Sequence, residues 1–514
     1  MIQKVKTYAN VGLEWHEIIV EADSSKSLPT IEIVGLPDAA IKESKERLRA
    51  TFRNAGILLP NRKIVLNLSP SDIRKVGTSF DLLMAVAILF LIFEDKIPLP
   101  NDEYLYFWEL GLDGSIKRVN GLLPSVISAM KQGYKHFFVP EENVYELEYV
   151  PGIKIYPIEK FDQIVEYFIE WKQLYSIDQA KDIETLYQQN NVHEVDFAHI
   201  KGQLIAKRAL AIAAAGLHNI VMVGAPGSGK TLLSKALPSI LPPLGFEEIL
   251  EVSQVYSLVG KLNKDIPLIT KRPFRQVHHT ASKISIVGGG AHLTPGEVSL
   301  AHKWILFFDE LTEFPREVLE VLRQPLEDRA VVISRVAGTI QYPANFMFVA
   351  AMNPCKCGYY KDPQKPCSCS LLDIKRYQSK ISWPLLDRID MILEIPREDI
   401  DKILNNILEE NSASIRDKVI NAWKIQQQRF LWLPISSNAQ ITSKHIDDLI
   451  PLDQGCKDFL AEASRKLTLS TRVVHRTIKL ARTIADIQAQ DVVTINHLAE
   501  ALQYRSKTMF VEAE

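Results

Sequence analysis

The sequence has almost no net charge and no long hydrophobic run. Its formal net charge at pH 7 is −2, so a nucleic-acid-binding surface would have to be a local patch or a pore assembled from several subunits. The longest apolar run, Leu82–Phe93, is too short to span a bilayer and predicts a buried helix. The N-terminus lacks the apolar core and cleavage site of a signal peptide. We therefore expect a cytoplasmic protein with no membrane partner.

Cysteine is also scarce, with five residues in the chain. Four of them, Cys355, Cys357, Cys367 and Cys369, form the pattern C-x-C-x₉-C-x-C in a loop rich in proline, glycine and lysine. In a reducing compartment this crowding favours metal or free thiols over disulfides. Four thiolates can complete the tetrahedral coordination of a structural Zn²⁺, although C-x-C is tighter than the usual C-x₂-C spacing. Zinc, free thiols and an oxidisable pair all stay open.

The length and the pattern of apolar residues predict three domains, with a linker between the first and the second. Residues 1–172 mix β-branched runs with helical stretches, as in an α+β domain. Residues 173–195 turn polar and predict a helical linker. Residues 196–397 alternate apolar strands with helices, which predicts a parallel sheet covered on both faces. Residues 398–514 show only helical periodicity and predict a helical lid.

A phosphate-binding loop stands between an apolar strand and a helix within Val221–Leu237. It has the pattern G-x-x-x-x-G-K-[ST], in which glycines let successive N–H groups point at phosphates and the next helix adds its positive dipole end. Lys230 is predicted to reach the β- and γ-phosphates and Thr231 to ligate Mg²⁺. The loop thus predicts ATP and Mg²⁺ as cofactors. The predicted nucleotide-binding residues are Gly224, Ala225, Pro226, Gly227, Ser228, Gly229, Lys230, Thr231 and Leu232.

Two later strands end in polar residues suited to ATP hydrolysis. The strand "WILFF" ends at Asp309, predicted to hold Mg²⁺, and Glu310, predicted to polarise the attacking water. The strand "FMFVAAM" ends at Asn353, whose amide could orient that water. A lone Asn at a strand end more often caps a turn, but the order of the motifs favours the catalytic role.

This order of motifs resembles the AAA+ superfamily, and more closely its branch with the magnesium-chelatase ATPase subunit, the MCM helicases and the bacterial YifB/ComM family. The likeness covers nearly the whole chain and rests on long strings, among them "VGLPDAAIKESKERLRA", "FRQVHHTAS", "GGGAHLTPGEVSLAH", "AAMNPCKCGYY" and "LLDRIDM". The resemblance implies that Arg388 is the arginine finger reaching a neighbouring subunit's γ-phosphate and that Arg472 is the sensor 2 arginine of the lid. Both imply a ring, and the family implies a homo-hexamer.

The same resemblance implies a Lon-protease-like, ribosomal S5-like fold for the N-terminal domain. Ser79 occupies the position of the Lon nucleophile. A Ser–Lys dyad also needs a lysine of depressed pKa, yet Leu123, Pro124 and Ser125 stand where it would fall. We therefore expect a non-proteolytic domain that serves assembly or substrate contact.

The family also implies a DNA-translocating motor that drives branch migration in recombination during natural transformation. A hairpin predicted at Val331–Pro343 would line the pore and grip single-stranded or branched DNA, with Arg335 near its tip. MCM proteins carry a lysine where Val336 stands, so Arg335 is an approximate substitute, and Arg272 and Arg275 are the next candidates. Two alternatives stay open, a chelatase-like ATPase that remodels a protein partner and an ATP-switched assembly scaffold.

Overall fold

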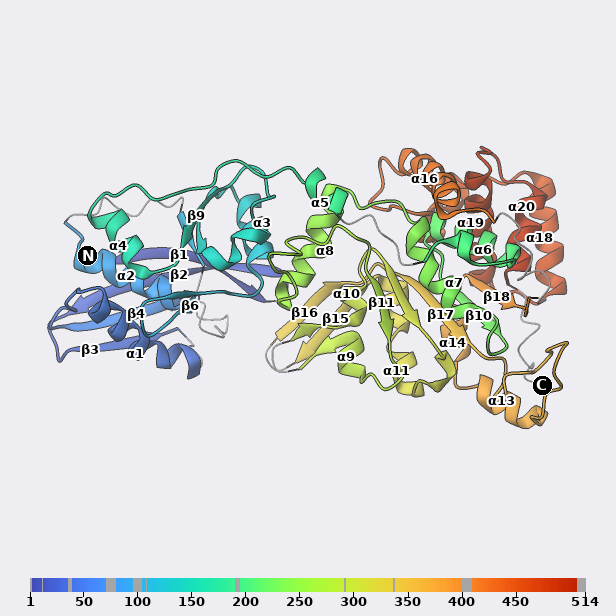
Figure 1. The fold of residues 1–514 in the computed structure, drawn as a ribbon, viewed down its shortest axis with the longest axis horizontal. Helices are drawn as coiled ribbons and strands as arrows, with labels where there is room; N and C mark the ends of the chain where they lie inside the picture. Colours follow the sequence, from blue (N-terminus) through green and yellow to red (C-terminus); the bar gives the residue numbers. More distant parts are fainter. Residues whose placement is uncertain are drawn as a thin grey trace.

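The computed structural model describes residues 2–11, 13–35, 39–70, 80–95, 104–107, 109–189, 195–290, 293–335, 338–398 and 409–505. The molecule is elongated, with the N-terminal sheet at one end, a parallel sheet in the middle and a bundle of helices at the other end (Figure 1). It is a mixed α/β multidomain protein with a helical C-terminal region, as the sequence predicts. Ser79 lies outside the described residues. No helix of the described part is long and apolar enough to cross a membrane.

The first half of the N-terminal region is a four-stranded sheet of order β1-β2-β4-β3 with two helices against it. Helix α2 (Asp81–Ile92) buries its first ten residues, which confirms the buried helix predicted from the apolar run. Asp81 accepts hydrogen bonds from Ser44 and Arg47 and so fixes α1 on α2. The other elements are β1 (Gln3–Val11), β2 (Glu14–Ser25), β3 (Thr30–Val34), α1 (Ala39–Asn54) and β4 (Lys63–Ser69).

The second half packs against the central domain. Its elements are β5 (Tyr104–Tyr106), β6 (Glu109–Leu110), β7 (Ile116–Lys117), α3 (Leu122–Lys131), β8 (His136–Pro140), β9 (Lys154–Ile158) and α4 (Phe161–Ile169). Apolar residues of α3 and of α8 (Phe246–Leu258) share one core. The Gly121 N–H donates to the Ser257 carbonyl over 3.0 Å, and the Ser257 hydroxyl donates to the Glu146 carboxylate over 2.6 Å. The two regions are therefore joined by packing as well as by the chain.

The predicted helical linker is wrong for most of its length. Within it, only α5 (Glu184–Gln189) is an α-helix among the described residues. Upstream of α5, Ile177 pairs with Ile155 of β9 through two backbone hydrogen bonds of 2.8 and 2.9 Å. This pairing with an existing strand overrides the local helical preference of a polar segment.

The central sheet is wholly parallel and has the order β11-β14-β17-β10-β18. Because helices cover both faces, its inner strands are buried on both sides. All carboxyl ends meet at one edge, where the phosphate loop follows β10. The elements are α6 (Leu204–Gly216), β10 (Ile220–Gly224), α7 (Lys230–Ala236), β11 (Phe274–Val277), β14 (Ile305–Phe308), α11 (Arg316–Glu320), α12 (Arg323–Asp328), β17 (Met347–Met352), α13 (Leu371–Gln378), α14 (Trp383–Leu386) and β18 (Met391–Ile395).

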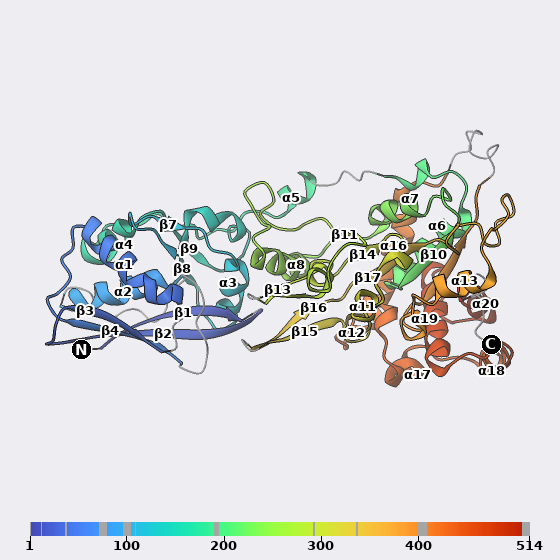
Figure 2. The same ribbon diagram turned by 90° about the horizontal axis from the view of Figure 1, so that it is seen from below.

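Two hairpins project from this domain toward the N-terminal region (Figure 2). The predicted hairpin is confirmed, since β15 (Ala330–Arg335) pairs antiparallel with β16 (Gly338–Pro343). The glycine-rich segment before β14 forms short elements rather than one helix: α9 (Lys283–Val287), β12 (Gly288–Gly289), β13 (Thr294–Pro295) and α10 (Glu297–Leu300). The Tyr342 hydroxyl donates to the Leu293 carbonyl over 2.7 Å and ties the two hairpins together.

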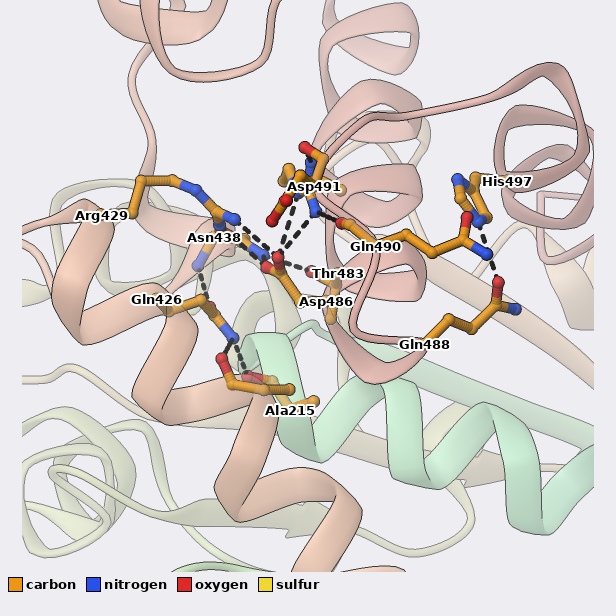
Figure 3. A network of polar contacts seen from close by, with 12 residues as sticks. Ala215, Gln426, Arg429, Asn438, Thr483, Asp486, Gln488, Gln490, Asp491 and His497 are labelled. Carbon is orange, nitrogen blue, oxygen red and sulfur yellow. Dashed lines mark hydrogen bonds and ion pairs between the residues drawn. The ribbon is translucent and has the colours of Figure 1, made fainter.

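The C-terminal region, the predicted lid, is helical and is built around a buried carboxylate (Figure 3). Asp486 accepts two bonds from Arg429, of 2.6 and 2.8 Å, and one of 2.7 Å from Asn438. Arg482 completes the cluster at 2.9 Å. Gln426 donates over 2.8 Å to the carbonyl of Ala215, which fixes the lid to α6. The helices are α16 (Ser412–Arg429), α17 (Ile446–Leu449), α18 (Gln454–Lys466), α19 (Thr471–Ile487) and α20 (Ile495–Gln503).

Asp486→Ala should unfold the lid at lower denaturant concentration than the wild type. The substitution leaves Arg429 and Arg482 without their shared carboxylate, and breaking a buried pair in this way costs about 3–5 kcal/mol. Urea unfolding followed by limited proteolysis of the lid measures the loss. Glu462→Ala, which removes an exposed ion pair with Lys466, is the matched control and should change stability by less than about 1 kcal/mol. Equal effects of the two substitutions would contradict the role of Asp486.

Candidate active site

The phosphate loop leaves the carboxyl end of β10 and enters α7. Gly227 and Gly229 have φ angles of 80° and 89°, a left-handed conformation that glycine adopts at little cost and that curls the loop. Gly224 has no room for a side chain, because a Cβ there would lie 2.4 Å from the Ile395 carbonyl oxygen. The glycines are thus needed for both conformation and close packing against β18.

Lys230 is buried at the start of α7 with its amino group turned toward the loop. Its Nζ donates to the carbonyl oxygens of Gly224 and Ala225, over 2.7 and 2.9 Å, and lies 3.4 Å from Oδ1 of Asn353. Burial lowers the pKa of Lys230 to about 8, with Asp309 opposing and Arg397 assisting the shift. A triphosphate bound in the loop would stabilise the charged form of this amine.

The predicted metal and water residues lie beside the loop. Thr231 at the start of α7 donates to Oδ2 of Asp309 over 3.0 Å, so a hydroxyl and a carboxylate from adjacent elements meet where Mg²⁺ would bind. Glu310 follows with a φ of 51° and an exposed side chain. The structure therefore brings Lys230, Thr231, Asp309 and Asn353 together, with Glu310 exposed at the same edge.

Arg388 and Arg472 lie away from this group. Strand β18 runs parallel to β10, with Ile220 opposite Met391. Because Arg388 precedes β18, Arg388 lies at the amino edge of the sheet. Each strand of five residues spans about 16 Å, which separates Arg388 from its own phosphate loop. Arg472, at the start of α19, joins Arg388 through a common partner, Glu327. The phosphate loop and this arginine pair therefore lie at opposite edges of the sheet.

Two side chains near the loop were not found by sequence reasoning. Arg397, just after β18, donates to the carbonyl of Pro226 over 3.1 Å and stacks 5.2 Å from the centre of the Tyr359 ring. Gln203 donates to the carbonyl of Pro396 over 2.7 Å. These contacts join residues as many as 193 positions apart, so no local motif signals them.

The four clustered cysteines form a compact set on the loop after β17. The Cys355–Cys357, Cys355–Cys367 and Cys357–Cys367 sulfur pairs are 3.3, 3.7 and 3.5 Å apart, and all four Sγ atoms lie within 4.8 Å of one another. Burial opposes ionisation of Cys357, but backbone N–H groups and neighbouring thiols outweigh it and lower its pKa to about 5.

The cysteine loop rests on the phosphate loop. A Cβ at Gly358 would lie 2.5 Å from the Pro226 ring, and Arg397 pairs with Asp362 at 3.4 Å while it contacts Pro226. A ligand that fixes the conformation of the cysteine loop would therefore also affect the conformation of the phosphate loop.

The two fallback DNA candidates, Arg272 and Arg275, both have internal partners. The Arg272 side chain is 6% exposed and lies between the rings of Trp304 and Trp423, at 5.1 and 4.9 Å. Arg275 is half-buried and makes two bonds to Glu297, of 2.6 and 2.7 Å. Arg272 therefore links the sheet domain to the lid.

The phosphate loop lies at the same edge of the parallel sheet as Asp309, after β14, and Asn353, after β17. This arrangement defines the class of P-loop ATPases. Models of the magnesium chelatase subunit ChlI match residues 196–403 and 20–143, and a model of the ChlI C-terminal region matches 409–505.

Relatives match over nearly the full length. Competence protein ComM of Haemophilus influenzae is 36% identical over 512 residues, covering 99% of this chain and 98% of the relative. The uncharacterized protein YifB of Escherichia coli is 37% identical over 503 residues, covering 98% and 96%. Rv2897c of Mycobacterium tuberculosis is 35% identical over 498 residues, covering 96% of each. The chain therefore belongs to the magnesium-chelatase-like AAA+ family that includes ComM and YifB, and the resemblance seen in the sequence is confirmed.

Glu310→Gln should bind ATP normally and hydrolyse it slowly. The change removes the carboxylate predicted to polarise water but leaves the phosphate loop and Asp309 intact, so turnover should fall on the order of 10²-fold or more. Lys230→Ala is the contrasting variant and should lose nucleotide affinity. A fluorescent ATP analogue and a phosphate-release assay separate the two effects. Wild-type turnover in Glu310→Gln would refute the assignment.

Proposed function

We propose that the protein is a Mg²⁺-dependent ATPase that works as a hexameric ring. The observation that carries this proposal is the separation of the two half-sites within one chain. Lys230 and Asp309 lie at the carboxyl edge of the sheet, whereas Arg388 and Arg472 lie at the amino edge. A neighbour in a ring would bring its arginine pair to this chain's γ-phosphate, and a homo-hexamer closes such a head-to-tail contact.

In this ATPase, Lys230 and the loop amides would bind the triphosphate, Thr231 and Asp309 would hold Mg²⁺, and Glu310 would polarise the water. The metal supplies charge neutralisation at the β- and γ-phosphates. The Thr231–Asp309 pair fits it, since both offer the oxygen ligands that Mg²⁺ prefers. The remaining named loop residues, Gly224 to Leu232, would contact the nucleotide as the sequence pattern predicts.

We further propose that the ring translocates on DNA and drives branch migration in natural transformation, with single-stranded or branched DNA in its pore. Support comes from the competence protein among its relatives and from the hairpin β15–β16, in which Arg335 pairs with Gly338 next to the tip. A chelatase-like ATPase acting on a protein partner is the second candidate, favoured by the match to ChlI models. An assembly scaffold switched by ATP is the third.

The proposed N-terminal domain, residues 1–172, is Lon-like and non-proteolytic. Ser125, where the dyad lysine would fall, donates to the Gly121 carbonyl over 2.8 Å. Residues 173–195 would be the connection, 196–397 the ATPase domain and 398–514 the lid. The proposed compartment is the cytoplasm, where the free thiols of residues 355–369 would persist.

We also propose that the cysteine cluster binds a structural Zn²⁺. A tetrahedron with Zn–S bonds of about 2.3 Å has S–S edges of about 3.8 Å. The sulfur separations of 3.3 to 3.7 Å are close to this size. Zinc would supply a fixed cross-link between the two C-x-C arms of the loop that touches Pro226.

DNA should stimulate ATP turnover, and Arg335→Ala should abolish the stimulation while leaving basal turnover unchanged. If Arg335 contacts phosphates, its loss should weaken binding to all sequences and flatten the salt dependence by about one unit per lost contact per subunit. ATPase rates at low salt with and without single-stranded and branched DNA test this. Arg465→Ala, at an exposed position of α18, is the control and should keep stimulation. A wild-type protein that neither binds DNA nor responds to it would favour protein remodelling instead.

Protein purified without added metal should contain about one zinc per chain. Cys355→Ser should lower the zinc content and weaken ATP binding, because the loop rests on Pro226. Cys456→Ala, a buried cysteine outside the cluster, should keep both. Elemental analysis with thiol titration measures the occupancy. Zinc near zero together with four freely titrating thiols would overturn the zinc site.

A further inference from the structure

Glu327 lies near the end of α12 and contacts both arginines of the amino-edge half-site. Its Oε2 accepts from Nη2 of Arg388, and its Oε1 lies 3.1 Å from Nη2 of Arg472. The Arg388 side chain is 10% exposed, whereas Arg472 and Glu327 are 49% and 45% exposed. One carboxylate thus joins a nearly buried arginine of the sheet domain to an open arginine of the lid.

The rest of Arg388 is held by contacts from both the sheet domain and the lid. Its carbonyl accepts from Nδ2 of Asn219 over 3.1 Å and from Nη1 of Arg476 over 2.9 Å. Its Nη1 donates to the Pro384 carbonyl over 2.7 Å. Each terminal guanidinium nitrogen carries two N–H groups, so these contacts leave a donor on Nη1 and on Nη2 for a phosphate oxygen.

Arg472, by contrast, extends from α19 of the lid. Two guanidinium groups of like charge repel each other when no anion lies between them. Glu327 supplies that anion and divides its two oxygens between them. Its position therefore sets the spacing of Arg388 and Arg472.

We propose that Glu327 is a positioning residue of the shared ATPase site. It holds Arg388 and Arg472 as a pair so that both meet the γ-phosphate of a triphosphate bound by the neighbouring subunit. Glu327 itself does not touch the nucleotide and acts through the two arginines. The inference rests on the proposed ring, and it assigns to α12 a part in hydrolysis at the neighbour's site.

The test compares Glu327→Gln with Asp328→Asn, which removes the same charge one residue along the chain. Glu327→Gln should lower kcat about 10- to 100-fold, the effect typical of groups that orient an active-site ligand. Its Kd for a fluorescent ATP analogue should stay near the wild-type value, because the phosphate loop and the Thr231–Asp309 pair of every subunit are unchanged. Asp328→Asn should keep both values. A wild-type kcat in Glu327→Gln, or a loss of its ATP affinity, would overturn the proposal.

Two further measurements exclude a merely structural role. The double variant Glu327→Gln/Arg388→Ala should be no slower than Arg388→Ala alone, because the two changes disable one unit. Additive losses would contradict this.

Mixing Glu327→Gln with Glu310→Gln subunits should restore part of the turnover, since some interfaces then carry neither defect. Arg388→Ala mixed with Glu310→Gln tests the ring itself. If that pair recovers turnover and the Glu327→Gln pair does not, only the role of Glu327 is refuted. If neither recovers in mixed rings verified by mass, the shared site and the role of Glu327 both fail.

Discussion

Strand β10 is the constraint on which both the phosphate loop and the Arg388–Arg472 pair depend. Asn219, the residue just before β10, joins it to both neighbouring strands. Its backbone N–H donates to the Asp390 carboxylate, and its carbonyl accepts from the N–H groups of Asp390 and Met391. Its side-chain Oδ1 accepts from the Phe348 N–H, and its Nδ2 donates to the Arg388 carbonyl. Five residues later Gly224 opens the phosphate loop. Because β10 is buried on both faces between β17 and β18, it acts as a rigid spacer. The nucleotide-binding edge and the arginine edge therefore cannot shift independently.

The lid is coupled to this spacer through Asp390. Burial would raise the pKa of Asp390, but Arg476, His218 and the Asn219 N–H outweigh it and hold the pKa well below its usual range. The carboxylate therefore stays charged and anchors Arg476 of α19. Arg472 stands one helical turn earlier on the same face of α19. The bond that docks the lid thus also brings Arg472 to Glu327.

The sequence was sufficient to predict those parts of the fold and the candidate site that depend on a local pattern of residues. The phosphate loop, the apolar strands before Asp309 and Asn353, and the buried helix at Asp81–Ile92 each show their structure within a short window. Long-range contacts left no such pattern. Glu327 meets Arg388 and Arg472 across 61 and 145 residues, and Arg397 meets Pro226 across 171.

The burial of Arg272 could not be predicted for the same reason, because its partners lie far away in the sequence. Arg272 is charged, and the sequence made it a candidate for DNA contact. In the fold, two tryptophans and three backbone carbonyls, those of Pro242, Pro243 and Lys303, surround its guanidinium. A single sequence gives the charge of a side chain but not the aromatic and carbonyl partners that make its burial tolerable.

The position of Glu327 also bears on how hydrolysis could reach the hairpin β15–β16. Arg329 alone separates α12 from β15. It is half-buried, its Nη1 donates to Oδ1 of Asn345 over 2.6 Å, and its carbonyl accepts from the Ala344 N–H over 2.8 Å. The junction between the two elements is therefore stiff. On the proposed mechanism, a γ-phosphate that draws Arg388 and Arg472 outward also pulls on Glu327, and α12 has no flexible segment in which to absorb that movement before β15. The same contact that aligns the arginines would thus carry their displacement to the hairpin proposed to hold DNA.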